Sequence, residues 1–236
     1  MVRMFRPILA GAEFRGRLIA CLGAAIAIAL VAAACAHPAL FTANLPAIVA
    51  PLGASAVLIF AVPASPLAQP WPVIGGNVIS ALVGITVFQA IPHPALAAGL
   101  AVGAAILVMS LLRCLHPPGG AAALTAVIGG APVHEAGYAF AFLPVGINSV
   151  LLVLIGIAFH ALAGRSYPHR PAAIPADPAG LHPSDIDAAL EEMDESFDIS
   201  PADLQALLTR AEAHAMRRRR PAPAAATRRF WNAGAR

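Results

Sequence analysis

Residues Ala95–Leu112 read ALAAGLAVGAAILVMSLL, an unbroken apolar run without a charged side chain. As an α-helix this run would be about 27 Å long, close to the thickness of the hydrocarbon core of a bilayer. The absence of charge extends further, because Arg113 is the only charged residue between Leu18 and His134. A water-soluble domain of that length needs a charged surface. The sequence therefore predicts an all-α membrane protein, with a bundle of apolar helices over residues 18–164.

The charged residues are concentrated outside this apolar region. Of the 236 residues, 59% are hydrophobic and 11% are charged, and the mean hydropathy is +0.76. Most of the acidic residues lie between Asp177 and Glu212, and all fifteen basic residues are arginine. The chain is therefore expected to divide into an apolar part and a polar tail. The expected regions are a cytoplasmic N-terminus (1–17), the transmembrane domain (18–164), a Pro/Ala linker (165–180), a cytoplasmic helical hairpin (181–220) and a disordered basic tail (221–236).

Long apolar runs predict four full transmembrane helices. Their expected bounds are residues 18–36, 73–91, 95–112 and 138–163. The first run follows Arg15 and Arg17 and ends in small residues, so a cleavable signal sequence is an alternative for it. Its length, about 28 Å as a helix, favours an uncleaved span.

Two further apolar pieces are interrupted by glycine and proline. Residues 51–57 and 118–124 share the pattern Pro-x-Gly-Ala-small-Ala-aliphatic, and each is the middle of a triplet of apolar segments. Six spans result if both pieces cross the membrane, and four if both re-enter. A three-plus-three inverted repeat would follow from the shared pattern, although chance similarity in an Ala-rich sequence explains it equally well. The stretches 63–72 and 129–137 are expected to be connections.

Arginines flank the apolar region at both ends. Arg3, Arg6, Arg15 and Arg17 precede the first span, and Arg165 and Arg170 follow the last. Because positive charge is enriched on the cytoplasmic side, both termini are expected in the cytoplasm of a bacterium with the protein in its inner membrane.

The polar tail predicts two amphipathic helices. Ser184 and Ser200 are expected to cap them, each with an Asp three residues later. The arginine-rich end of the tail would be solvated or lie on an anionic leaflet. Nucleic-acid binding is not expected, because no recognised module accompanies the charge.

The strongest candidate site lies between two apolar segments. It contains Arg113, His116, Pro117, Pro118, Gly119 and Gly120. Two prolines followed by glycines suit a helix start, whose free N–H groups and positive dipole end favour an anion. A second helix start would add Gly53 and Ser55, and Asn77 lies in the third span. The alternative is structural, with Arg113 reaching to the interface and His116 capping a neighbouring helix.

The sequence contains no constellation typical of an enzyme. No HExxH, GxSxG or nucleotide-binding loop occurs, and the three cysteines, Cys21, Cys35 and Cys114, show no CxxC spacing. We therefore expect no enzymatic activity, no metal and no cofactor.

Three motifs carry a resemblance to a known family. Along the chain they are Pro51–Leu58 (PLGASAVL), Ser65–Pro70 (SPLAQP) and Leu115–Leu124 (LHPPGGAAAL). Together they resemble the HPP family of membrane proteins, which is named for the His-Pro-Pro matched here by His116, Pro117 and Pro118. The resemblance implies four transmembrane helices and, since some members are implicated in nitrite transport, nitrite or a similar anion as cargo. Residues 177–220 are similar to the region that precedes paired CBS domains in longer members. If those domains sense nucleotides and regulate the membrane part, we expect this chain to lack that regulation.

These observations favour transport of a small inorganic anion, most of all nitrite, at the His-Pro-Pro and Pro51–Ser55 segments. His116, with an ordinary imidazole pKa of about 6.5, would couple protons to transport. The expected partners are the lipid bilayer and the anion, and a homo-oligomer is left open. The rival reading is a non-transporting anchor or assembly subunit whose tail binds a partner protein.

Overall fold

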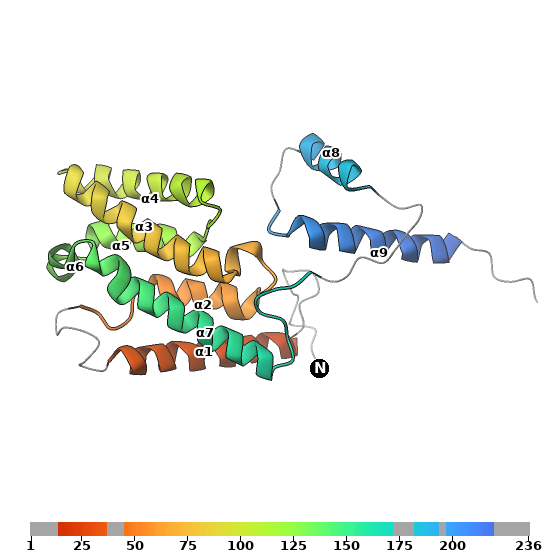
Figure 1. The fold of residues 1–236 in the computed structure, drawn as a ribbon, viewed down its shortest axis with the longest axis horizontal. Coiled ribbons are helices and arrows are strands. Elements are labelled where there is room, and N and C mark those ends of the chain that lie inside the picture. Colours follow the sequence, from red (N-terminus) through yellow and green to blue (C-terminus); the bar gives the residue numbers. More distant parts are fainter. Residues whose placement is uncertain (1–13, 37–44, 172–181, 194–196, 220–236) are drawn as a thin grey trace, which may run out of the picture. The chain divides into compact units, whose positions relative to one another are not determined.

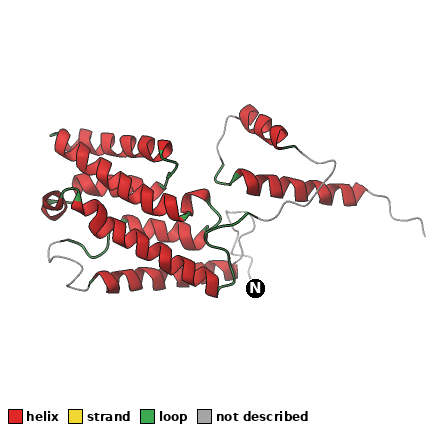
Figure 2. Cartoon of the chain, viewed as in Figure 1, coloured by secondary structure: helices red, strands yellow, loops and turns green. Residues whose placement is uncertain are grey.

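A computed structural model describes residues 14–36, 45–171, 182–193 and 197–219, and every regular element in these ranges is helical (Figures 1 and 2). The chain divides into two compact units, Met1–Arg170 and Pro171–Arg236, and each is described by itself. The predicted all-α fold is confirmed.

The first unit contains the apolar helices. Four are long and apolar enough to cross a membrane, as predicted, and α2 and α5 are the two shorter apolar helices. The elements of this unit are α1 (Phe14–Cys35), α2 (Pro51–Ala61), the 3-10 turn η1 (Pro66–Ala68), α3 (Pro70–Ala90), α4 (Pro94–Leu111), α5 (Pro117–Ile128), α6 (Ala131–Ala136), the π-helical η2 (Ala141–Gly146) and α7 (Ile147–Leu162). Segments η2 and α7 together form the fourth long span.

The chain reverses direction at each successive apolar helix from α1 to α5, and α7 runs opposite to α5 (Figure 1). The starts of α1, α3 and α5 therefore lie at the same end as the ends of α2, α4 and α7. We call this the arginine end, because Arg15, Arg17, Arg113 and Arg165 all lie in or next to these helix termini. Helices α2 and α5 are only about 16 and 18 Å long, shorter than a hydrocarbon core. The alternating directions suit six crossings of the membrane. The three-plus-three inverted repeat stays a prediction.

Glycines allow α3 and α5 to approach closely. A Cβ atom at Gly84 of α3 would lie 2.5 Å from the carbonyl oxygen of Ala123 and 2.7 Å from the Cβ of Ala126, both in α5. At Gly119 of α5, a Cβ would lie 2.9 Å from the carbonyl oxygen of Gly76. Small residues are the usual means by which membrane helices bring their backbones together. Helix α3 also packs against α4, η2 and α7, so it is the centre of the unit.

Several predicted boundaries were wrong, and prolines explain most of the differences. Helix α3 begins at Pro70 instead of residue 73, and α6 lies inside the stretch 129–137 that was expected to be a loop. Each of these helices has a proline in its first turn, where the missing N–H has no intrahelical partner in any case. These prolines thus lie at the starts of helices, whereas the prediction placed them in connections between helices. Among the described residues, α1 already includes Phe14, before the expected start of the span at residue 18.

The second unit contains the two predicted tail helices, α8 (Pro183–Met193) and α9 (Pro201–Arg219). Ser200 caps α9 as predicted, because the Asp203 N–H donates to Ser200 Oγ at 3.1 Å. The prediction for Ser184 was wrong. It lies inside α8, and the N–H of His182 before the helix donates to Asp185 Oδ2 at 2.9 Å. Packing of the two helices as a hairpin stays a prediction, and most of the predicted linker and basic tail lie outside the described residues.

The α3–α5 contact predicts a position-dependent effect of adding one methyl group. Gly84→Ala should destabilise the protein by about 1–3 kcal/mol, because overpacking must push the two backbones apart. Gly103→Ala is the matched control, since a Cβ at Gly103 on α4 would meet nothing within 4 Å. Thermal unfolding of both variants in detergent, followed by size-exclusion chromatography, measures the difference. Equal stability of the two variants would contradict the close contact.

Candidate functional site

Four buried polar side chains meet between the helices of the first unit. They are Ser55 of α2, Asn77 of α3, His116 directly before α5, and Ser149 of α7, and none is more than 2% exposed. We call these four residues the polar cluster. Asn77 and Ser149 each lie about two turns into antiparallel spans, roughly 10 to 12 Å from opposite ends. The polar cluster therefore lies near the middle of the bundle.

The hydrogen bonds of the polar cluster run in a defined order. His116 Nδ1 lies 2.8 Å from the carbonyl oxygen of Leu67, which can only accept, so Nδ1 carries the hydrogen. His116 Nε2 lies 2.8 Å from Ser55 Oγ. The amide nitrogen of Asn77 donates to Ser55 Oγ and to Ser149 Oγ, both at 3.1 Å, and Ser149 Oγ donates to the carbonyl oxygen of Val145 at 2.8 Å. The network thus links α2, α3, α7 and the start of α5.

The backbone around His116 fixes the position of its ring. His116 is extended, with φ −141° and ψ 108°, and Pro117 and Pro118 start α5 directly after it. A Cβ at Gly76 of α3 would lie 2.6 Å from the Cβ of His116. Only glycine at position 76 therefore lets the His116 side chain pass α3 and reach Ser55.

Two buried oxygen atoms beside this network have no hydrogen-bond partner among the described residues. They are Asn77 Oδ1 and Ser80 Oγ, on successive turns of α3. Buried polar atoms are nearly always paired, so an unpaired one calls for a reason. A Cβ at Gly119 would lie 2.7 Å from Ser80 Oγ, which places this hydroxyl directly against the first turn of α5.

The N–H groups at the two helix starts are less available than the sequence suggested. Pro117 and Pro118 have none, and the Gly119 N–H donates to the carbonyl oxygen of His116 at 2.8 Å. At the start of α2, Leu52 and Gly53 donate to Val49 and Ala50 at 3.0 and 3.1 Å. These N–H groups are therefore already hydrogen-bonded within the first turn of each helix. The unpaired polar atoms of the site belong to the side chains of Asn77 and Ser80.

The remaining predicted site residues are not members of the polar cluster. Arg113 has φ +53° and ends α4, with its N–H donating to Ser110 and the Cys114 N–H donating to Met109. This is a Schellman cap, in which glycine usually takes the position that Arg113 occupies. The Arg113 side chain is exposed, and so is Gly53. Gly120 faces α4, where a Cβ would lie 3.8 Å from Val102 Cγ1.

Two polar residues of the last span were missed by the sequence analysis. Ser149 belongs to the polar cluster. Its neighbour Asn148 accepts from the Val49 N–H at 3.1 Å and donates to the carbonyl oxygen of Ala47 at 3.0 Å, which fixes the chain before α2. The available signal was the Asn-Ser pair within an otherwise apolar run.

The connection between α2 and α3 is held from several sides, and this positions the Leu67 carbonyl for His116. Gln69 donates to the carbonyl oxygens of Pro63 and Ser65, at 3.0 and 2.7 Å. The Tyr167 hydroxyl donates to the carbonyl oxygen of Ala68 at 2.8 Å. Burial raises the pKa of Tyr167 well above its usual range, so it stays a donor at physiological pH.

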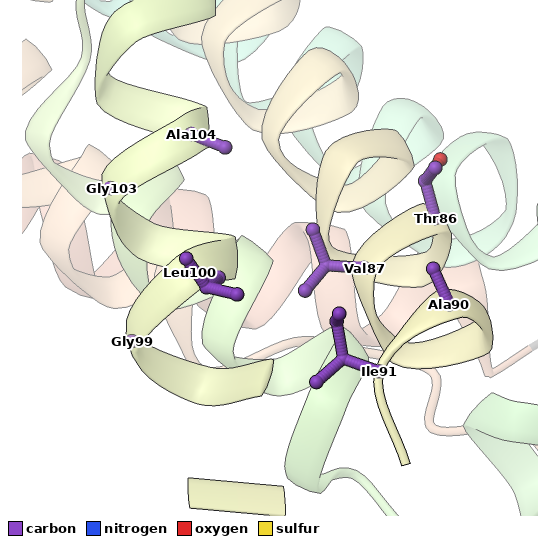
Figure 3. A pocket seen from close by; sticks show the side chains of 8 residues that line it. All are labelled: Thr86, Val87, Ala90, Ile91, Gly99, Leu100, Gly103 and Ala104. Carbon is purple, nitrogen blue, oxygen red and sulfur yellow. The ribbon is translucent and has the colours of Figure 1, made fainter. Parts of the chain in front are cut away.

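An open groove of about 420 Å³ lies between α3 and α4 (Figure 3). Thr86 is the only residue with a polar side chain among those that line it, and the lining includes no member of the polar cluster. It is lined by Thr86, Val87, Ala90, Ile91, Gly99, Leu100, Gly103 and Ala104. An apolar groove of this kind offers no ligands for an ion. Over the described ranges, no three His, Cys, Asp or Glu side chains gather as metal ligands.

Comparison with known proteins identifies the family. The family described as "HPP, transmembrane region" matches residues 10–168. Two transmembrane proteins of Dictyostelium discoideum are similar: one is 37% identical over 131 residues (53% of this chain, 46% of the relative), the other 39% identical over 120 residues (49% and 38%). The chain thus spans less than half the length of these curated relatives. No solved structure matches the chain significantly. The chain belongs to the HPP family of integral membrane proteins.

Proposed function

We propose that this protein transports a small inorganic anion across the membrane by way of the polar cluster. The observation that carries the proposal is a buried, uncharged hydrogen-bond network near the middle of an apolar bundle, with the unpaired hydroxyl of Ser80 beside it as a free donor for an anion. Polar groups inside a membrane are costly and usually mark the path of a substrate or ion. Nitrite is the first cargo to test, because the resemblance to HPP proteins implicated in nitrite transport suggests it.

The charge distribution favours an anion over a cation. Glu135 is the only carboxylate between residues 18 and 164, and it lies in the short helix α6. Cation pathways ordinarily use carboxylates or rings of backbone carbonyls. In the proposed site, the Ser80 hydroxyl donates to the anion, and the side chains of Ser55, Asn77 and His116 lie beside it. Pro118 and Gly119 hold the backbone next to the site. The Gly119 N–H would donate to the anion only if its hydrogen bond to the carbonyl oxygen of His116 broke.

In this proposal the anion reaches the polar cluster from the arginine end, and the same end sets the orientation of the protein in the membrane. Arg15, Arg17, Arg113 and Arg165 lie there, and arginine is enriched on the cytoplasmic side of membrane proteins. We therefore place this end, and both termini, in the cytoplasm of a bacterial cell. Arg113, exposed and three residues from His116, would attract the anion toward the site.

The rival function is a membrane anchor whose tail recruits a partner. Helix α9 favours this reading because Leu207 is 58% exposed and Met216 is 42% exposed. Exposed apolar residues on an amphipathic helix suit a protein or a membrane surface.

Loss of the Asn77 side chain should abolish most of the flux. With Asn77→Ala, nitrite uptake into proteoliposomes should fall about tenfold or more, because the variant removes the two donated hydrogen bonds that join Ser55 to Ser149. Ser110→Ala is the matched control, since Ser110 is exposed on α4 and its hydroxyl donates to the carbonyl oxygen of Ile106 in its own helix. Nitrate, formate and chloride as competitors would rank the cargoes. Full flux in folded Asn77→Ala would rule out the polar cluster as the path.

Removal of the tail separates transport from anchoring. A chain that ends after Arg170 keeps the whole first unit. A transporter should retain at least about half of its flux in this form, because the polar cluster is intact. An anchor should instead lose its partner and its cellular phenotype. Measuring anion uptake and recovery of the partner protein, with both the full-length chain and the chain that ends after Arg170, decides between transport and anchoring.

A further inference from the structure

The polar cluster contains no fixed charge that could balance a bound ion. Among the elements packed around His116, α2, α3, α4, α5 and the connection 62–69 have no titratable side chain, and the span formed by η2 and α7 has only His160. The nearest such groups along the chain are Cys114, which is buried, and Arg113, whose side chain is exposed. Tyr167 bonds to the next carbonyl after Leu67. An anion that entered this site alone would be an uncompensated buried charge, which is strongly unfavourable.

We propose that each anion binds together with one proton, which His116 accepts at Nε2 and which the hydroxyl of Ser55 accommodates. This inference rests on the proposed function, and it specifies the cargo as an anion plus a proton with no net charge.

The geometry at Ser55 allows both protonation states of His116. Ser55 Oγ lies 2.8 Å from His116 Nε2 and 3.2 Å from the carbonyl oxygen of Pro51, and it has one hydrogen to donate. With a neutral ring, the hydroxyl donates to Nε2. When Nε2 takes a proton from the aqueous phase, the new N–H donates to Ser55 Oγ and the hydroxyl hydrogen turns to Pro51. No heavy atom has to move.

The rest of the polar cluster is compatible with this exchange. The Asn77 amide donates to Ser55 Oγ in either state, because the oxygen accepts that bond whichever way its own hydrogen points. His116 Nδ1 is already committed to the Leu67 carbonyl, so the added proton can reside only at Nε2. The added proton therefore lies on the side of the ring that faces Ser55, and the positive charge is shared over the whole ring.

Proton and anion should consequently favour each other's binding. A protonated His116 without a carboxylate nearby is unfavourable, as an unaccompanied anion is, and the attraction between the two charges offsets part of both penalties. Linkage is reciprocal, so anion binding must draw a proton onto the site and low pH must strengthen anion binding. Coupled movement of the pair would be insensitive to membrane potential.

The test measures proton uptake on binding and during flux. Nitrate is the main probe, because its conjugate acid is too strong to cross lipid as a neutral acid, and nitrite is the second. Adding either anion to the purified full-length protein in weakly buffered detergent should take up about one proton per bound anion. In proteoliposomes, a change of about 100 mV, set with potassium and valinomycin, should alter the rate less than twofold.

Three variants and one control, Ser110→Ala, assign the effect to residues. His116→Gln should abolish the proton uptake, since the amide keeps hydrogen bonding but does not titrate. Ser55→Ala should shift the pH profile of binding, and Ser55→Thr should restore it, because threonine returns the hydroxyl. Ser110→Ala should behave as wild type throughout.

The outcomes separate the two proposals. Flux that follows the membrane potential without proton uptake would overturn the coupling and leave transport intact. Proton uptake on binding without any flux would support the coupled site and overturn transport. Absence of both, in protein shown to be folded, would overturn both.

Discussion

The arrangement of this membrane unit depends on the two hydrogen bonds of a single buried ring. His116 contacts the Leu67 carbonyl with one nitrogen and Ser55 with the other, each at 2.8 Å. Within a bilayer there is no bulk water to satisfy such groups, so the protein itself must supply their partners. The glycines at positions 76 and 119 make this possible by letting α5 lie against α3. The close packing of α3 on α5 and the hydrogen bonding of His116 therefore depend on each other.

The sequence predicted the fold class and the four long helices well, because a charge-free region of that length has few alternatives. It also singled out His116, Ser55 and Asn77, which the structure brings together. Ser149 was missed because its contact with Asn77 arises from the packing of α3 on α7, which no local pattern encodes. Arg113 was expected in the site, yet its positive φ and its role in ending α4 follow from backbone geometry that a residue type alone does not predict.

A site built from neutral donors and acceptors has a functional consequence. Without a fixed counter-charge, the described bundle offers an anion no stable position unless a positive charge arrives with it, and the imidazole of His116 is the group that can carry it. Membership of the HPP family is consistent with a membrane role, while the curated relatives are described as transmembrane proteins and share less than half of their length with this chain. An anion as cargo is therefore our proposal for this chain, and it rests on the polar cluster.

The central claim is that His116 is the anion-responsive group of the polar cluster. Nitrogen-15 NMR of imidazole-labelled protein in lipid bilayers tests it most directly, with His116→Gln used to assign the signal. The account predicts a neutral ring with its hydrogen on Nδ1 in the absence of anion, and a doubly protonated ring when nitrite or nitrate is added at the same pH. A His116 signal that does not change with saturating anion would contradict the account.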